Sequence, residues 1–229
     1  SLACAQSDSE YLIGGTQDNG GRQRISGTNC AATNGGDAMV TAIDPTDKDV
    51  FYTTYVNGQP YRPTDGWNND TYNDISANIP GGQPNGKWVT PYVIDPNSNT
   101  TLVAAYDDIY RTTNRGNTWT KLSTNLAGGE VFQTVAVAPS NSDVIYASWE
   151  NIIFVTTDLG NTWNSLTPPL SSSQTITSIA VHTTAANTFW FTIDGSSSTK
   201  KVYQTHDGGQ TWNNWTDNTP NIPANTLIY

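Results

Sequence analysis

Acidic and aromatic residues recur at one kind of turn along this chain, and their chemistry suits sugars. The sharpest stretch is 17–21, Gln-Asp-Asn-Gly-Gly, in which Asp18 stands before a pair of glycines. Two carboxylates on either side of a glycosidic bond can cleave it, one as acid and one as base. Carboxylates beside exposed aromatic rings can also bind a sugar without cleaving it, because the rings stack on its apolar faces.

The candidate residues stand at or beside short turns between apolar segments. Asn57 occupies the turn equivalent to that of Asp18 in the next repeat, and a neutral amide cannot serve as acid or base. An alternative interpretation is that turns simply favour Asp and Asn, and that the aromatic side chains pack between repeats. Asp18 is the one catalytic candidate. The binding candidates are Asp37, Tyr55, Trp88, Tyr106, Asp107, Asp108, Phe132, Trp149 and Glu150.

A motif that occurs three times indicates the elements that must position these residues. Segments 112–119, 156–163 and 205–212 share the pattern Thr-x-Asp/Asn-x-Gly-x-Thr-Trp, and their tryptophans stand 44 and 49 residues apart. A period of this size is typical of repeat proteins. Asp or Asn bonds its own backbone, Gly takes a positive φ, and the flanking residues favour strands, so each copy predicts a β-hairpin. We interpret the motif residues as structural; they are Asn114, Gly116, Trp119, Asp158, Gly160, Trp163, Asp207, Gly209 and Trp212.

The pattern resembles the Asp-box, or BNR repeat, of sialidases, xyloglucan-active glycoside hydrolases, sortilin-type receptors and a photosystem II assembly factor. The resemblance covers most of the chain and implies a β-propeller, with the box at an outer turn of each blade, away from the active face. Asp18 is similar to the aspartate of the Asp-x-Gly-Gly turns that carry catalysis in the xyloglucan-active enzymes. Those enzymes use two such aspartates, and this chain offers one good match.

A second recurring feature precedes each box hairpin: an apolar strand, a turn with Pro, Asn or Asp, and another strand. Together the two features predict an all-β propeller of four-stranded antiparallel blades. The blades span about 37–80, 87–126, 131–169 and 174–220, and the first has a degenerate box at 64–67.

The two ends of the chain predict partial elements. Residues 10–34 read as a blade without a first strand, and residues 225–229 read as a first strand alone. Either they complete one blade of a five-bladed ring, or the chain is part of a longer propeller or packs against a partner. The blade numbers of the resembling families favour the second interpretation.

Charge and cysteine usage restrict the partners. The net charge of −10 disfavours nucleic acid and anionic membranes, which call for basic patches. We expect no metal or cofactor; Ca²⁺ would suit the acidic turns at 107–108 or near Asp18, but no loop has its full ligand spacing. The chain has no apolar run long enough for a transmembrane helix. Cys4 and Cys30 predict one disulfide in an exported protein, with two free thiols as the alternative.

These observations predict an extracellular, periplasmic or cell-surface recognition module that binds a glycan or a protein through an acidic, aromatic face. The alternatives are an inverting glycoside hydrolase of the xyloglucan-active type and a subunit of a larger assembly. Because half of the catalytic aspartate pair is missing, we favour a protein that is not an enzyme.

Overall fold

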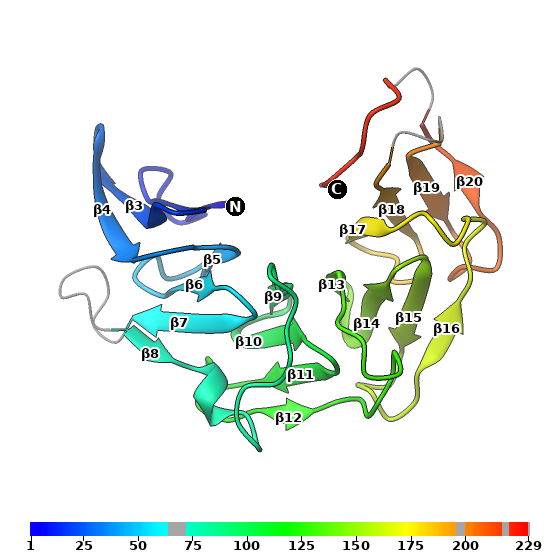
Figure 1. Ribbon diagram of the computed structural model, residues 1–229, viewed down its shortest axis with the longest axis horizontal. Helices are drawn as coiled ribbons and strands as arrows, with labels where there is room; N and C mark the ends of the chain where they lie inside the picture. Colours follow the sequence, from blue (N-terminus) through cyan, green and yellow to red (C-terminus); the bar gives the residue numbers. More distant parts are fainter. Residues whose placement is uncertain (64–71, 196–199, 217–219, 229) are drawn as a thin grey trace.

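The computed structural model describes residues 1–63, 72–195, 200–216 and 220–228. In these residues the chain forms five four-stranded antiparallel sheets and one short 3-10 helix, η1 (Ser76–Asn78). Figure 1 shows the sheets side by side around an open arc, with the first strand of each sheet on the inner side and the fourth on the outer side. Each sheet is a blade, which confirms the predicted all-β propeller architecture.

Each sheet takes four consecutive strands in chain order. Sheet 1 contains β1 (Leu2–Cys4), β2 (Leu12–Thr16), β3 (Gly20–Ser26) and β4 (Asn29–Asn34). Sheet 2 contains β5 (Thr41–Ile43), β6 (Phe51–Tyr55), β7 (Gln59–Pro63) and β8 (Tyr72–Asp74). Sheet 3 contains β9 (Tyr92–Asp95), β10 (Ser98–Ala105), β11 (Ile109–Thr112) and β12 (Thr120–Lys121). Sheet 4 contains β13 (Thr134–Ala138), β14 (Asn141–Trp149), β15 (Ile152–Thr156) and β16 (Asn164–Leu166). Sheet 5 contains β17 (Ile176–Val181), β18 (Phe189–Ile193), β19 (Val202–Thr205) and β20 (Asn213–Asn214).

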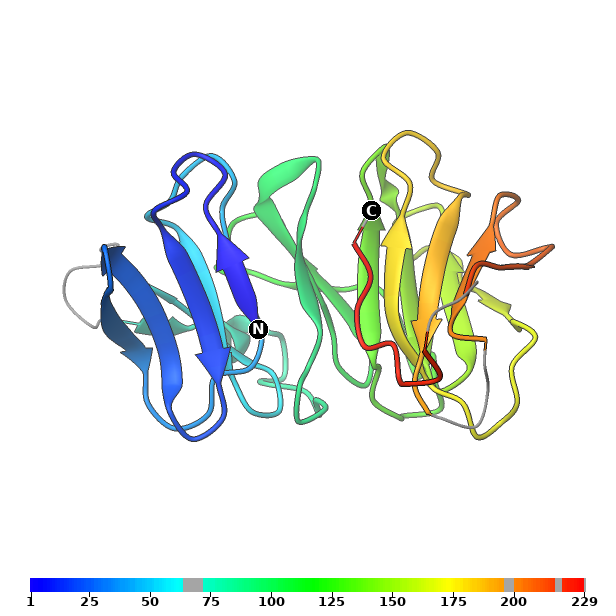
Figure 2. The same ribbon diagram turned by 90° about the horizontal axis from the view of Figure 1, so that it is seen from above.

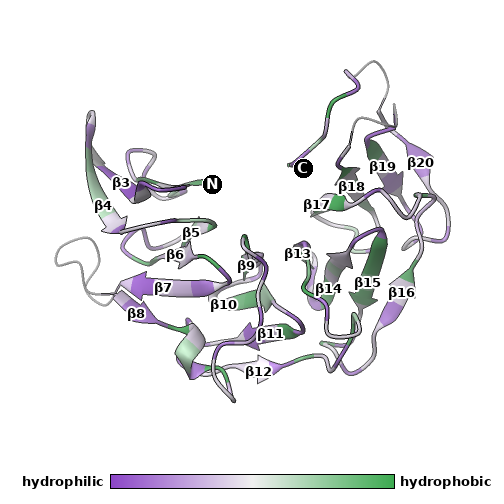
Figure 3. Ribbon diagram, in the orientation of Figure 1, coloured by the Kyte–Doolittle hydropathy of each residue, from purple (hydrophilic) through white to green (hydrophobic). Residues whose placement is uncertain are grey.

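The core lies between neighbouring sheets rather than inside any one of them. Residues 144–148 of β14 are all buried, because sheets 3 and 5 cover the two faces of sheet 4. Figure 3 shows the corresponding hydrophobic colour on β10, β15 and β18. Between sheets 4 and 5 the rings of Tyr146 and Phe189 lie 4.4 Å apart. Burying one such ring contributes about 1.5–3 kcal/mol, so the sheets hold one another in place.

The first residues of the chain complete sheet 1. Strand β1 pairs with β2, so that Leu2 lies opposite Gly14 and Cys4 opposite Leu12. The prediction that residues 10–34 and 225–229 share a blade is therefore wrong. Leu2–Cys4 is too short to stand out as a strand in the sequence, and it becomes one through its pairing with β2.

Residues 220–228 run beside sheet 5 instead. The Ala224 N–H donates to the Ile193 carbonyl at 3.1 Å, and the Leu227 N–H donates to Ser178 Oγ at 3.3 Å. In Figure 1 the two chain ends lie on either side of the opening of the arc.

The predicted disulfide is also wrong, because both Cys4 and Cys30 are free and exposed. They stand on β1 and β4, the two edge strands of sheet 1. Three interstrand spacings, about 14 Å in all, separate these edges. A disulfide requires Cα atoms within roughly 7 Å.

Two further points concern limits of the chain. The degenerate box at 64–67 lies outside the described residues. In the part of the chain that the structure describes, no helix has the length and apolar character needed to cross a membrane.

Candidate functional site

The three motif turns close on themselves through one hydrogen-bond network. In sheet 4 the Thr156 hydroxyl donates to Asp158 Oδ1 at 2.8 Å, and the same carboxylate accepts from the Thr162 N–H at 2.9 Å and the Thr162 hydroxyl at 2.7 Å. Gly160 takes a φ of 84° and donates its N–H to Thr156 Oγ1. The hydrogen bonds from Thr162 and Thr156 hold the pKa of the Asp158 carboxyl below its usual range.

The same network recurs in the neighbouring sheets. Asp207 accepts from Thr205 and Thr211, and Asn114 stands in the same relation to Thr112 and Thr118. These side chains are committed to holding their own turns.

The motif tryptophans fasten the turns to the core. Trp119 Nε1–H donates to the Ile75 carbonyl of the preceding sheet at 2.9 Å, and Trp163 Nε1–H donates to the Leu122 carbonyl at 2.9 Å. Trp212 packs edge-on against the rings of Phe189 and Phe191. The box turns therefore join blades, and this gives a structural account of the motif.

The turns between second and third strands lie at the other end of the sheets. In Figure 2 the loop between β1 and β2 is at the top of sheet 1, and the turn between β2 and β3 is at its bottom. The Asp18 N–H donates to Asp37 Oδ1 at 2.7 Å, and the Glu150 N–H donates to Gln133 Oε1 at 2.8 Å. Each contact joins a turn to the segment that leads into the next sheet. We call the surface made by turns 17–19, 56–58, 107–108 and 150–151 and segments 35–40, 85–91 and 130–133 the turn face.

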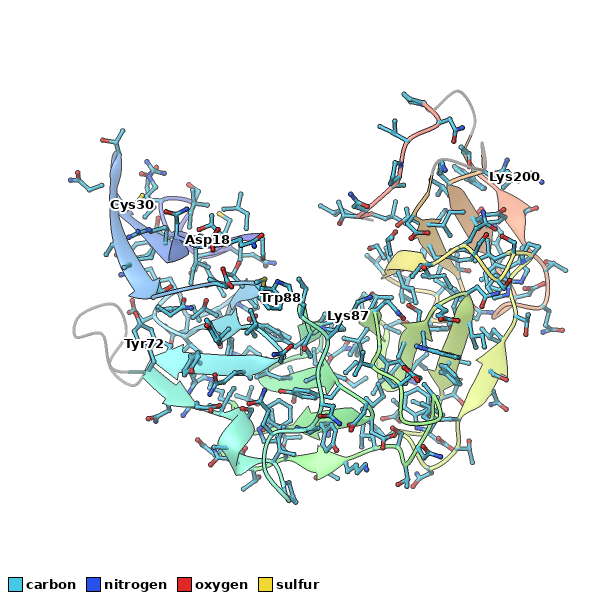
Figure 4. The ribbon with its side chains drawn as sticks, viewed as in Figure 1. Asp18, Cys30, Tyr72, Lys87, Trp88 and Lys200 are labelled. Atoms are coloured by element: carbon cyan, nitrogen blue, oxygen red, sulfur yellow. The ribbon has the colours of Figure 1, made fainter. Side chains whose placement is uncertain are left out.

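The turn face presents exposed acidic and aromatic side chains. Asp18 and Glu150 are exposed, and their backbones take positive φ values of 64° and 49° that direct the turns. Trp88 is 50% exposed and Tyr55 is 37% exposed. Figure 4 shows Trp88 and its neighbour Lys87 on the inner side of the arc. Burial lowers the pKa of the Lys87 ammonium, and the charge of Asp194 opposes that shift.

Two predicted binding aromatics are buried and need correction. Tyr106 is 1% exposed, and its hydroxyl donates to the Gly58 carbonyl at 2.6 Å. This burial raises the pKa of the Tyr106 phenol well above its usual range. Phe132 is fully buried and packs edge-on against Phe154. Both rings fill the space between sheets, so neither can stack on a ligand.

Asp108 is likewise a structural residue. Its carboxylate accepts from the Ser123 hydroxyl and the Leu126 N–H at Oδ1, and from the Asn125 N–H and the Lys121 ammonium at Oδ2. Burial acts to raise the pKa of this carboxyl, but the hydrogen bonds from Ser123 and Lys121 outweigh it and lower the pKa. Four donors occupy its lone pairs, so Asp108 offers none to Ca²⁺ or to a sugar.

The remaining candidates fall between these extremes. Trp149 and Asp107 are half-buried, and Trp149 packs against the core between sheets 3 and 4. Asp37 is brought next to Asp18, but it accepts the Asp18 N–H and so holds that turn. Within residues 1–63, 72–195, 200–216 and 220–228, no three His, Cys, Asp or Glu side chains gather to hold a metal ion.

The sequence interpretation missed Gln59 and Tyr61 on β7. Together with Tyr55 and Asn34 they line a hollow of about 350 Å³ that opens beside the turn face. The signal was available in the sequence: Gln59 and Tyr61 alternate along a strand, so they share a face with the polar end of sheet 2.

Comparison with known families decides the relationship. Residues 107–224 match the Sortilin-Vps10 family, described as sortilin, neurotensin receptor 3. This match covers just over half of the 229 residues. The chain belongs to the Sortilin-Vps10 family. A comparison of this family member with curated proteins finds no match.

Several solved structures resemble this Sortilin-Vps10 member in fold. An ancestral GH74 enzyme superposes with a TM-score of 0.74 at 14% identity, over 94% of this chain and 31% of the enzyme. The GH74 enzyme of Niastella koreensis gives 0.69 at 19% identity, over 96% and 37%. YCF48 from Cyanidioschyzon merolae gives 0.63 at 10% identity, over 93% and 70%. The chain thus spans about a third of the length of these two GH74 enzymes, and the likeness shows the propeller fold.

Proposed function

We propose that this chain is a recognition module that binds a glycan or a protein ligand through the turn face. The carrying observation is the backbone network that joins neighbouring turns while Asp18, Glu150 and Trp88 keep exposed side chains. A rigid backbone with outward-pointing groups loses little conformational entropy on binding. Membership of a family described as a neurotensin receptor also supports ligand binding.

An extracellular, periplasmic or cell-surface location belongs to the same proposal. It rests on the family and on the acidic, charge-poor composition, because both exposed cysteines are free thiols and give no disulfide in its support.

The test is a binding screen with variants on this face. The immobilised chain is exposed to a glycan array and to a panel of secreted proteins. Every ligand found is then titrated against Trp88→Ala and Glu150→Gln. We expect at least one of these variants to weaken binding about tenfold, since a well-placed aromatic contact is worth about that much. The matched control is Thr113→Ala, at an exposed position of a box turn. Equal affinities for all variants would contradict the proposal.

The second candidate is a glycoside hydrolase, and it rests on Asp18 and the likeness to the GH74 enzymes. Inverting hydrolysis needs a second carboxylate roughly 6.5–9.5 Å away on the other side of the bond. Asp37 lies against the Asp18 backbone and serves that turn instead. The hydrolase would be supported if the chain released reducing sugar from a polysaccharide and Asp18→Asn abolished the release. The binding module requires that Asp18→Asn leave a non-hydrolysed ligand bound.

A further inference from the structure

The interface between sheets 1 and 2 differs from the other interfaces in the arc. Sheets 2 to 5 place an aromatic residue at one register position of the third strand; these are Tyr61, Tyr110, Phe154 and Tyr203. The last three are 5–8% exposed and pack toward the preceding sheet. Tyr61 is only partly buried. Figure 3 shows the contrast in colour, with β15 hydrophobic and β7 hydrophilic.

The connecting segments explain this contrast. Between sheets 2 and 3 the long connection 75–91 places Ile75 and Ile79 in the core with Tyr110. Between sheets 1 and 2 the connection is 35–40, and it begins with two glycines. Such a short connection supplies no bulky side chain to cover Tyr61.

The uncovered space is a groove. Two hollows of about 350 and 330 Å³ share Asn34, Gly35 and Tyr61, so they are continuous. We call this space the tyrosine groove. One wall is formed by Tyr55, Gln59, Tyr61 and Tyr72, and the other includes Asn34 and Gly35. Figure 4 labels Tyr72 on the outer side of sheet 2, and Tyr55 belongs to the turn face.

The strand register places the three tyrosines in a diagonal row. Tyr55 lies opposite Gln59, and Tyr72 lies opposite Pro63. Gln59, Tyr61 and Pro63 alternate along β7, so all of these side chains share one face of sheet 2. Successive tyrosines are one strand and two residues apart, which is about 8 Å between Cα atoms. The row is therefore about 16 Å long.

The polar groups of the groove are held in place. Gln59 Nε2–H donates to Asp74 Oδ2 at 2.8 Å, and Asp74 Oδ1 accepts the Ser76 N–H at 2.9 Å. On the other wall, Asn34 Oδ1 accepts from Thr53 Oγ1 at 3.1 Å. These bonds orient both amides before any ligand arrives, which reduces the cost of binding.

We propose that the tyrosine groove binds a stretch of a neutral oligosaccharide. Tyr55 and Tyr61 stack on the apolar faces of successive sugar rings, and the oriented Gln59 amide bonds their hydroxyls. The six residues that define the groove carry no charge to pair with an acidic sugar and no aliphatic side chain to grip an apolar peptide residue. This inference rests on the proposed function, since the groove opens on the turn face at Tyr55.

The experiment uses the full chain on a printed array of neutral β-glucan, xylan, mannan and galactan oligosaccharides, with sialylated and sulfated sugars alongside. The best neutral sugar is titrated calorimetrically against Tyr61→Ala and against Gly35→Trp. A Cβ at Gly35 meets no atom within 4 Å, so the bulky ring blocks the groove without disturbing the fold. Trp215→Ala is the matched control, because Trp215 is 59% exposed and stands on sheet 5 beyond β20.

We expect binding of a neutral sugar, a loss of about tenfold or more in both groove variants, and unchanged affinity in the control. Tyr61→Phe keeps the ring and should retain most of the affinity, which separates a lost contact from a lost fold. If Trp88→Ala weakens sugar binding while both groove variants bind normally, the groove inference fails and the proposed function stands. If only charged sugars, peptides or proteins bind, the groove inference is overturned. If no ligand of any class binds, both fail.

Discussion

The box turns and the turn face use the same residue types at opposite ends of the same sheets. In the box, the carboxylate of Asp158 or Asp207 accepts hydrogen bonds from the turn that it belongs to. On the turn face, Asp18 and Glu150 are held by their backbone N–H groups, and their side chains are exposed. Only a side chain whose hydrogen-bonding capacity is left over can meet a ligand. The position of the bond, on side chain or backbone, separates structural acids from functional ones.

The largest effect should follow from removing a box tryptophan. Trp119 is buried, and its indole N–H bonds the preceding sheet. Trp119→Ala should therefore lower the free energy of unfolding by about 3–5 kcal/mol. Urea denaturation followed by circular dichroism measures this. A loss below about 1 kcal/mol would show that the box does not fasten the blades.

Acid should weaken the box through its carboxylates. The hydroxyl and backbone of Thr211 and the hydroxyl of Thr205 lower the pKa of Asp207. Because the folded pKa lies below the unfolded value of about 3.9, the stabilisation is complete above that pH and is lost as the pH falls through the folded pKa. The urea midpoint should thus fall below about pH 4. Asp207→Asn, which copies the native Asn114, should flatten that fall; an unchanged pH profile in this variant would contradict the network.

One box position offers a smaller, stabilising change. The buried Asp44 accepts from Arg115 Nη2 of the next box at 2.9 Å. Asp95 holds the same position one sheet on, with a buried Oδ2 that has no hydrogen-bond partner among the described residues. The next box has Leu159 in place of arginine, with nearly the same backbone φ. Leu159→Arg should raise the free energy of unfolding by about 1 kcal/mol. The gain should vanish in combination with Asp95→Asn, which a double-mutant cycle in urea tests.

The smallest effect is expected on the turn face. Trp88 is half exposed, so Trp88→Ala should change the free energy of unfolding by no more than about 0.5 kcal/mol. The same variant is expected to weaken ligand binding. A thermal melt beside the binding titration separates the two properties. A clear loss of stability would place Trp88 with the box tryptophans and weaken the comparison.

Local signals predicted much of the fold. Each box is eight consecutive residues, and its hydrogen bonds join residues two to four positions apart, such as Thr156, Asp158 and Thr162. The strand pairs around the Pro turns are also neighbours in the chain. The candidate site was less predictable, because exposure depends on the next sheet. Tyr55 and Tyr106 end equivalent strands, yet Tyr106 is enclosed and Tyr55 is not.

The sequence by itself determined the blade repeat, the box turns and the acidic character of the chain, since all three are written in short contiguous segments. Only the tertiary structure decided that Leu2–Cys4 completes sheet 1, that Cys4 and Cys30 stand on opposite edges, and that Phe132 lies inside. It also decided that Tyr61 faces a groove. These outcomes depend on which side chains a neighbouring sheet or connection brings against them, and that packing joins residues far apart in the chain.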